Sequence, residues 1–379
     1  THDWVVTLGG AEKCLEVFRE LYPDAPLYTL VYDDKSVEKL GFSKDRVHGT
    51  FLQKKRNIQE KYRRYLPFFP YAIEQFDLSD ADVILSSSHC AAKGVLTRGD
   101  QLHICYCHTP VRYAWDLTHR YLRENNLEKG FKSTVARMIL HYIRMWDIQT
   151  ANRVDYFIAN SHYTARRIWR TYRKEATVIY PPVDVERFEF NENKDDFFLF
   201  VSRLVPYKKA DLIIKAFNEL GLPLLVVGDG PQMEECKRIA GKNVQLLGYQ
   251  GDKEVADLMA RARALVFAAD EDFGIVPVEV QACGTPVIAF GKGGATETVI
   301  PANGTNWDKA TGIYFYEQSV PALKEAVNKF LEWEDKFDYG VIRANAERFS
   351  RERFKKEIKD FVDEKYSDFK QRIYNYGID

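Results

Sequence analysis

The sequence predicts an α/β protein made of two doubly wound parallel-sheet domains that face a cleft between them. At 379 residues the chain is too long for one ordinary domain and long enough for two. Short β-branched runs alternate with segments of helical period in both halves, which is typical of βαβ units. Pro181 and Pro182 interrupt this pattern near the midpoint and indicate a hinge.

Composition excludes several classes of protein. Hydrophobic residues make up 45% of the chain, which is enough to build a core. The net charge of −1 leaves no excess of positive charge that would indicate a nucleic-acid partner. No apolar run reaches the roughly 18 residues of a membrane span, and no signal peptide is visible. The six cysteines are dispersed, and Cys105-Tyr106-Cys107-His108 lacks the further ligands of a zinc site. We therefore expect a cytoplasmic protein, whose natural chain starts a few residues before Thr1.

The second half shows the alternation most clearly. Strands are expected at Phe197–Leu204, Leu222–Val227, Val244–Gly248, Ala264–Ala269, Thr285–Phe290 and Gly312–Phe315. Helices are expected at Lys208–Leu220, before Ala240, and at Asp252–Ala262 and Phe273–Cys283. Because crossovers between parallel strands are right-handed, ligands should bind at the carboxyl ends of these strands.

The first half repeats the pattern with longer insertions. Strands are expected at Val5-Val6, Leu27–Val31, Val83–Ser86, His103–Cys107, Tyr156–Ala159 and Thr177–Tyr180, and an amphipathic helix at Thr134–Ala151. From Ser350 the chain has helical period with one apolar face. We predict an N-terminal domain of residues 1–183 completed by a helix of 350–379, and a C-terminal domain of residues 184–349.

Two acids follow the expected strand at Ala264–Ala269. Glu271 stands in the loop at its carboxyl end, and Glu279 lies in the helix that follows. Both can accept hydrogen bonds from the hydroxyls of a sugar and a ribose. The first amides of that helix, from Gly274 and Ile275 onward, suit phosphate oxygens. Asp270 and Asp272 are interpreted as acids that complement the helix dipole.

A second loop supplies positive charge. Arg203 and Lys208 lie five residues apart, at the carboxyl end of the expected strand Phe197–Leu204 and across a proline-restricted turn. Two cations aimed at one point can stabilise a departing diphosphate without proton transfer. In the first half, Gly9-Gly10 opens a helix where backbone amides can approach a pyrophosphate, and His108 ends a strand.

Together these motifs resemble those of the family 4 glycosyltransferases, which are retaining enzymes of the GT-B fold with two Rossmann-like domains. The resemblance rests on Glu271 and Glu279 with Phe273-Gly274 between them, on Arg203 with Lys208, and on Gly9-Gly10. It also includes Gly293-Gly294 with Glu297, and the stretch from Asn160-Ser161 to Pro181-Pro182-Val183-Asp184. These motifs span nearly the whole chain.

The resemblance implies roles for individual residues. Glu271 would contact the donor sugar and Glu279 the ribose, while Arg203 and Lys208 hold the diphosphate beside Phe273, Gly274 and Ile275. The segment from His108 to Asp116 is similar to one in bacterial polysaccharide mannosyltransferases. There the histidine lies beside the transferred sugar, and Arg112, Tyr113, Trp115 and Asp116 would face the acceptor.

The function implied is transfer of a hexose, mannose from GDP-mannose, to a glycan or lipid-linked glycan acceptor in cell-surface polysaccharide or glycolipid synthesis. His108, Glu271, Arg203 and Lys208 would carry the catalysis, without a metal or another cofactor. No carboxylate other than Glu271, whose implied role is binding, is placed to act as a covalent nucleophile. We therefore expect the diphosphate to depart from, and the acceptor to attack, the same face of the sugar.

Three alternatives use the same residues. Asp270 and Asp272 form a D-x-D sequence after an apolar strand, as in metal-dependent GT-A transferases. A sugar-nucleotide epimerase would convert its donor without an acceptor. A non-catalytic protein would bind the nucleotide-sugar and release nothing.

Residues 54–71 combine a basic run with an aromatic cluster. Lys54-Lys55-Arg56 and Lys61-Tyr62-Arg63-Arg64 precede Phe68-Phe69-Pro70-Tyr71. Such a surface can dock on the anionic inner face of the cell membrane. A charged helix followed by a packed aromatic loop would give the same pattern, so both interpretations stay open.

Overall fold

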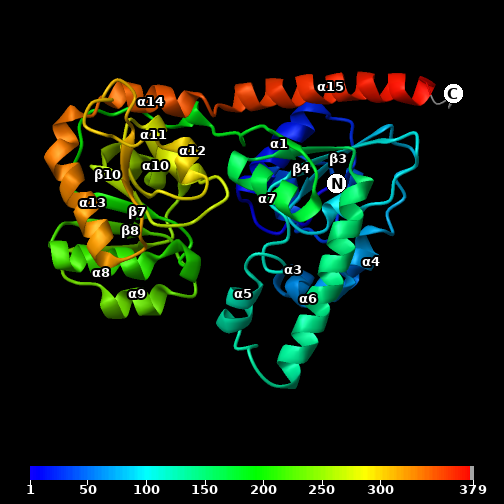
Figure 1. Cartoon of the computed structure of the whole chain (residues 1–379), viewed down its shortest axis with the longest axis horizontal. Helices are drawn as coiled ribbons and strands as arrows, with labels where there is room; N and C mark the ends of the chain where they lie inside the picture. The colour runs from blue at the N-terminus through cyan, green and yellow to red at the C-terminus, as the bar shows by residue number, and fades with distance from the viewer. Residues whose placement is uncertain (376–379) are drawn as a thin grey trace. The chain divides into compact units, whose positions relative to one another are not determined.

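A computed structural model describes residues 1–375, which divide into two compact units (Figure 1). One unit contains residues 1–181 and the chain from 354 onward, and the other contains residues 182–353. We expected boundaries at 183 and 350. The last four residues of the expected terminal helix, 376–379, lie outside the described residues.

The C-terminal unit is built on a six-stranded parallel sheet. Its strands are β7 (Phe198–Val201), β8 (Leu224–Val227), β9 (Val244–Gly248), β10 (Ala264–Phe267), β11 (Val287–Phe290) and β12 (Gly312–Phe315). They lie in the order β12-β11-β10-β7-β8-β9. The chain therefore runs outward from β7 to β9 and then returns to β10 on the other side of β7. Loops at the carboxyl ends of β7 and β10 flank this reversal, where doubly wound sheets bind ligands.

The N-terminal unit follows the same plan. Its strands are β1 (Leu27–Thr29), β2 (Val47–Gly49), β3 (Val83–Ser88), β4 (Leu102–Cys107), β5 (Tyr156–Ala159) and β6 (Ala176–Val178), all paired in parallel. The chain's first residues lie between β1 and β3, because His2 bridges Thr29 on one side and Ser87 on the other. The strand order therefore also reverses here, beside the turn at Gly9-Gly10.

Two local expectations are wrong. Val5-Val6 is not a strand: Val5 makes an isolated bridge to Tyr32, and Val6 lies in a bend where the chain turns toward Gly9. The helix expected at Lys208–Leu220 is split, because Lys209 adopts a left-handed conformation with φ 62°. Lys208 therefore ends a separate 3-10 turn, Pro206–Lys208.

Helices cover the sheets of both units. The N-terminal unit has α1 (Gly10–Leu21), α2 (Asp34–Lys39), α3 (Ile58–Lys61), α4 (Phe69–Ile73), α5 (Thr118–Glu124), α6 (Phe131–Thr150) and α7 (His162–Tyr172). The C-terminal unit has α8 (Ala210–Leu220), α9 (Met233–Ile239), α10 (Asp252–Arg261), α11 (Ile275–Ala282), α12 (Ala295–Thr298), α13 (Val320–Trp333) and α14 (Tyr339–Glu347). The chain then forms α15 (Arg351–Asn375). No helix among the described residues is long and apolar enough to cross a membrane.

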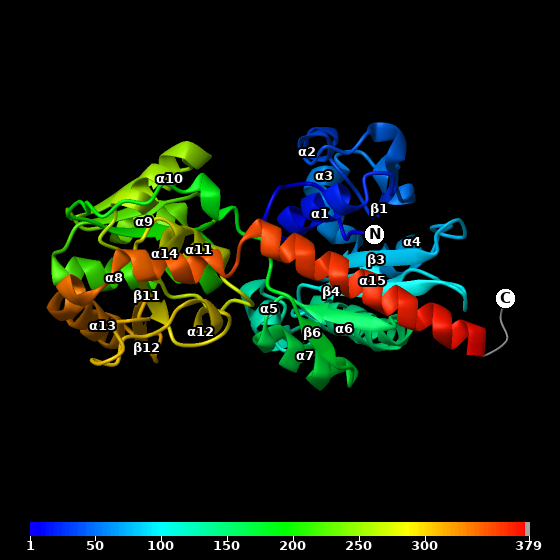
Figure 2. The ribbon, with the colours of Figure 1, turned by 90° about the horizontal axis from the view of Figure 1, so that it is seen from above.

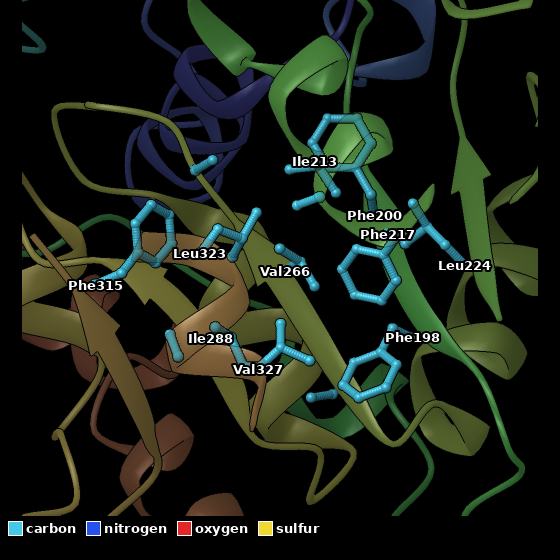
Figure 3. Close-up of a cluster of buried hydrophobic side chains, with 14 of the residues drawn as sticks. Phe198, Phe200, Ile213, Phe217, Leu224, Val266, Ile288, Phe315, Leu323 and Val327 are labelled. Atoms are coloured by element: carbon cyan, nitrogen blue, oxygen red, sulfur yellow. The ribbon is translucent and has the colours of Figure 1, made fainter. Parts of the chain in front are cut away.

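The core of the C-terminal unit lies between its sheet and helices α8 and α13 (Figure 3). Phe198 of β7 meets Phe217 of α8 edge-on at 5.2 Å and Phe330 of α13 at 5.8 Å between ring centroids. Val266 of the neighbouring strand and Leu323 of α13 are also fully buried in this cluster. This packing fixes the positions of β7 and β10, whose carboxyl ends carry the two loops of interest.

Helix α15 runs along the N-terminal unit (Figure 2), and its apolar side chains pack against the core of that unit. Phe354 is fully buried, and its ring lies 6.0 Å from Phe18 of α1 and 5.6 Å from Tyr106 of β4. Ile358 and Phe361 continue the same contact. The end of the chain thus completes the core of the unit in which the chain began.

Replacing Phe354 with alanine should destabilise the N-terminal unit by about 3–5 kcal/mol, because the cavity left between Phe18 and Tyr106 cannot fully collapse. Hydrogen exchange of the amides in β3 and β4 would report this loss. Tyr374→Ala, which truncates a side chain of α15 that is 76% exposed, is the control and should leave protection unchanged. Equal protection in both variants would contradict this account of α15.

Candidate functional site

Two loops at the strand-order reversal of the C-terminal unit bring opposite charges together. Lys208, which follows β7, forms an ion pair with Glu271, which follows β10. The two side chains are only 15% and 18% exposed. Arg203 lies exposed on the same loop as Lys208. Three of the predicted site residues therefore lie near one another at the carboxyl ends of two central strands of one sheet.

A glycine turn holds the loop that carries Arg203. The Leu204 amide donates to the carbonyl of Asp229 at 2.9 Å, and the Gln232 amide donates to the Leu204 carbonyl at 3.1 Å. Gly228 has φ 129°, and a Cβ at this position would collide with the Ser202 carbonyl. Sequence reasoning did not predict that this turn supports the Arg203 loop. The Gly-Asp-Gly sequence after a strand was the available signal.

A second glycine pair supports the Glu271 loop. The Gly294 amide donates to the Glu271 carbonyl at 2.8 Å. A Cβ on Gly293 would collide with that carbonyl, and a Cβ on Gly294 would collide with the backbone of Phe273. The ring of Phe273 also packs on Phe349 at 5.5 Å. Close backbone approach, which only glycine permits, therefore sets the position of Glu271.

Helix α11 begins directly after this loop. Gly274 precedes it with φ 85°, and Ile275 is its first residue. The first amides of a helix have no acceptor within the helix, so this end suits an anion. Glu279 lies about one turn further along and is only 9% exposed. The structure therefore places Glu271 and Glu279 on a continuous loop and helix.

Electrostatics at the loop pair favour binding of an anion. Burial, together with the charge of Arg203, lowers the pKa of Lys208 to about 8, while Asp272 opposes the shift. Contact with the Glu271 carboxylate favours the charged ammonium as well. Lys208 is therefore protonated at neutral pH, and it lies close enough to Arg203 for the two positive charges to interact.

The first acid of the D-x-D sequence forms an ion pair within the protein. Asp270 pairs with Lys292 at 3.0 Å between Oδ2 and Nζ. Among residues 1–375, no group of three or more His, Cys, Asp and Glu side chains is placed to hold a metal ion. Cys105 and Cys107 are buried in β4, where they pack as apolar side chains.

His108 stands at the carboxyl end of β4 in the N-terminal unit. Its Nε2 lies 2.8 Å from the Ser87 hydroxyl, and its carbonyl accepts a hydrogen bond from Asn160 at 3.0 Å. Burial, together with the neighbouring His89 and His2, lowers its pKa to about 3. The ring is therefore neutral at physiological pH and can donate or accept a hydrogen bond.

The turn at Gly9-Gly10 lies at the start of α1. The Gly9 amide donates to Glu12 at 2.8 Å, and Glu12 lies 3.6 Å from the buried ring of His2. Burial alone would raise the pKa of Glu12, but His2 holds it below the ordinary value. A carboxylate of the protein therefore already satisfies one of the donors that we expected a pyrophosphate to meet.

Asp3 is a residue that sequence reasoning missed. Its fully buried carboxylate accepts hydrogen bonds from the backbone amides of residues 89–92 at 2.6–2.9 Å. His89 also lies 3.0 Å from it through Nδ1. Burial favours the neutral acid, but His89 and these amides hold the pKa of Asp3 below its usual value. Asp3 thus fixes the loop after β3, beside His108.

The expected acceptor segment uses most of its polar atoms within the N-terminal unit. Tyr113 places its hydroxyl 3.1 Å from the thiol of Cys90. Asp116, which is exposed, lies 3.5 Å from Arg112 and 3.3 Å from Arg167. Arg112 and Asp116 thus belong to a polar cluster with Arg167, whereas the hydroxyl of Tyr113 contacts a buried thiol.

A buried ion pair anchors the same segment. Lys93 lies 2.6 Å from Asp147 between Nζ and Oδ1, and both side chains are almost completely buried. Asp147 also accepts hydrogen bonds from the indole of Trp115 at 2.7 Å and from the hydroxyl of Tyr172. Sequence reasoning missed this network, because its members are far apart along the chain.

Comparison with known proteins identifies two matching families. The model of the family described as glycosyl transferases group 1 matches residues 183–373, and that of glycosyltransferase family 4 matches residues 29–187. A solved Anabaena protein in complex with UDP superposes with a TM-score of 0.67 over 96% of this chain and 98% of its own, at 19% identity. The galactosyltransferase WaaB, solved in its apo form, gives 0.66 at 17% identity, over the same shares of both chains. These structures share the GT-B fold of two Rossmann-like domains.

Curated relatives match part of the chain. A glycosyltransferase of Methanocaldococcus jannaschii is 32% identical over 186 residues, which are 48% of this chain and 51% of that protein. A GDP-mannose-dependent mannosyltransferase of Corynebacterium glutamicum, which acts on a phosphatidylinositol monomannoside, is 33% identical over 183 residues, 40% of this chain and 48% of that protein. The chain thus spans about half the length of the curated relatives it matches.

Replacing Gly294 with alanine should displace the loop that carries Glu271 and destabilise the C-terminal unit by about 1–3 kcal/mol, because the new methyl group meets the Phe273 backbone. Hydrogen exchange of residues 270–275 and the unfolding temperature would report both effects. Gly99→Ala is the control, since a Cβ there meets nothing within 4 Å. An unfolding temperature and a loop protection equal to those of the control would contradict this packing.

Proposed function

Because the chain belongs to the group 1 glycosyl transferases, we propose that it is a retaining, metal-independent glycosyltransferase. It moves mannose from GDP-mannose to a glycan or lipid-linked glycan acceptor in cell-surface polysaccharide or glycolipid synthesis. The observation that carries this proposal is the convergence of Arg203, Lys208 and Glu271 at the edge of one parallel sheet. The preference for mannose is supported by the GDP-mannose-dependent relative.

The roles of the donor-site residues follow from their chemistry. Arg203 and Lys208 bind the diphosphate and stabilise the negative charge that develops on it. Glu271 accepts hydrogen bonds from the sugar hydroxyls, and Glu279 accepts them from the ribose. The diphosphate competes with Glu271 for Lys208, so donor binding frees the Glu271 carboxylate to face the sugar.

The transfer step needs no protein nucleophile. The bond between the anomeric carbon and the diphosphate oxygen breaks, and its electron pair leaves with the diphosphate. The acceptor hydroxyl forms its bond to the same face of that carbon, and its proton passes to the departing phosphate oxygen. Neutral His108 donates or accepts a hydrogen bond at the transferred sugar, while Arg112 and Asp116 bind the acceptor. The pairing of Asp270 with Lys292 supports a mechanism without metal.

The reaction is proposed to take place at the membrane surface, because a lipid-linked acceptor is held there. Lys54, Lys55, Arg63 and Arg64 are exposed, as are the rings of Phe68 and Tyr71. Basic side chains attract anionic headgroups, and exposed rings enter the interface. These side chains support the proposal that residues 54–71 contact the inner face of the cell membrane.

The proposal is tested with a panel of GDP-, UDP- and ADP-sugars, each with a lipid-linked acceptor, with and without EDTA. GDP-mannose should release the most diphosphate, and EDTA should change nothing. The UDP-sugars are an informative arm, because the solved Anabaena protein binds UDP. Loss of release in EDTA would favour the metal-dependent alternative. Conversion of a donor without an acceptor would favour an epimerase, and no release from any donor would favour a binding protein.

Two variants separate the roles of the acids. Glu271→Gln should lower kcat by roughly 100-fold or more, because it removes a charge at the reacting sugar. Glu279→Gln should instead raise the Kd for GDP about tenfold by weakening a hydrogen bond to the ribose. Glu325→Gln, at an exposed acid of α13, is the control. Equal and negligible effects of both site variants would refute the assignment.

The affinity for GDP should fall as the pH rises through about 8. The pKa of Lys208 lies below its ordinary value, so the lysine is charged below this pH and loses its proton above it. The loss can reach about tenfold in Kd per pH unit. Lys208→Arg should flatten the profile, since arginine stays charged. Lys209→Arg is the matched control, and its affinity for GDP should still fall as the pH rises. Calorimetric titration measures both, and a fall that persists in Lys208→Arg would assign the titration to another group.

A further inference from the structure

Helix α6 carries apolar side chains on two opposite faces. Leu140 and Ile143 are buried against Val111 and Leu122 of the same unit. On the other side Phe131, Val135, Met138, Tyr142 and Met145 are exposed, and Phe131 and Met138 are 83% and 66% exposed. A helix that only covered its own core would need the first face and not the second.

The exposed side chains form one continuous stripe, the α6 stripe, defined as residues 131, 135, 138, 142 and 145. Their alternating spacing of four and three residues confines them to an arc roughly 80° wide. The helix is about 30 Å long, and in Figure 1 its lower part extends beyond the sheet beside α5. The stripe is therefore a long and narrow apolar surface, not a set of scattered side chains.

The exposed charges on α6 are of one sign. Lys132 and Arg137 are exposed on the helix, and so is His141, one turn after Arg137. Along residues 131–150, all described in the structure, the one carboxylate is Asp147, which is buried with Lys93. The surface beside the stripe thus offers positive charge and no negative charge from this helix.

We propose that the α6 stripe docks on an anionic lipid bilayer, with its apolar side chains in the interface and Lys132 and Arg137 against the headgroups. Charge complementarity favours this occupant, because anionic lipids attract juxtaposed basic side chains. Two copies of α6 packed together would instead bring basic helices against each other without exposed acids to pair with them.

The α6 stripe would be a second membrane contact beside residues 54–71. The inference rests on the proposed function only for the reason to bind a membrane, which is access to a lipid-linked acceptor. Both elements belong to the N-terminal unit, and Leu66 of the 54–71 segment packs against the same cluster as Leu140 and Ile143. Two separate lipid contacts on one unit bind more firmly than either alone.

The test measures flotation with vesicles of phosphatidylcholine, with and without phosphatidylglycerol. The parent protein should bind the vesicles that contain phosphatidylglycerol, and Met138→Ser/Tyr142→Ser should weaken this binding about tenfold. The matched control is Leu96→Ser/Tyr374→Ser, which removes two exposed apolar side chains outside α6. Lys132→Gln/Arg137→Gln should weaken binding to the anionic vesicles alone, most strongly at low salt.

Circular dichroism and the unfolding temperature show that each variant is folded, and Phe131→Ser/Val135→Ser provides a second substitution of the same stripe. Unchanged vesicle binding in both stripe variants, or absent binding by the parent, would overturn the proposal. So would a stripe variant that alters only the sedimenting mass, since this identifies a second copy as the occupant.

Sugar transfer to a water-soluble glycan is measured in parallel. Loss of vesicle binding with transfer intact supports the docking surface. Vesicle binding by a parent protein that transfers no sugar would refute the proposed function and leave the docking surface standing.

Discussion

The reversal of strand order within each sheet is the constraint on which the structure depends. In a parallel sheet the carboxyl ends of all strands lie at the same side of the sheet. The loops that follow these ends diverge only where the order of the strands reverses. This happens between β7 and β10 and again between the chain's first residues and β3. Lys208 and Glu271 meet at the first reversal, and Gly9-Gly10 and the loop fixed by Asp3 lie at the second. Much of the candidate site therefore results from topology, and side-chain chemistry refines it.

Glycine contacts complete what topology begins. Gly228 and Gly294 let one loop backbone approach another closely enough to fix Arg203 and Glu271 in place. The geometry at the sheet edge is thus carried mainly by the backbone. The side chains that would meet a ligand remain available because other atoms hold their loops.

Local patterns in the sequence were sufficient for most of the fold. Val244–Gly248, Tyr156–Ala159 and Gly312–Phe315 are strands with the predicted bounds, because each is a short apolar run between turn residues. Placing Lys208 and Glu271 at strand ends predicted that both lie at the same side of one sheet, but not that they form an ion pair. Long-range contacts could not be predicted in this way. Nothing near Asp3 in the sequence indicates that its partners are the amides of residues 89–92, and helical period alone does not reveal that α6 is apolar on two faces. The break at Lys209 was missed because a left-handed lysine has no clear sequence signal.

The buried pair of Lys93 and Asp147 also constrains how this protein can change over evolutionary time. Losing either partner leaves the other charge unpaired in the protein interior, and losing Asp147 also removes the acceptor of the Trp115 indole. Substitutions at these positions are therefore epistatic: a change at one is tolerated only with a compensating change at the other. In diverging descendants, the two positions should be inherited as a linked set, although 54 residues separate them along the chain.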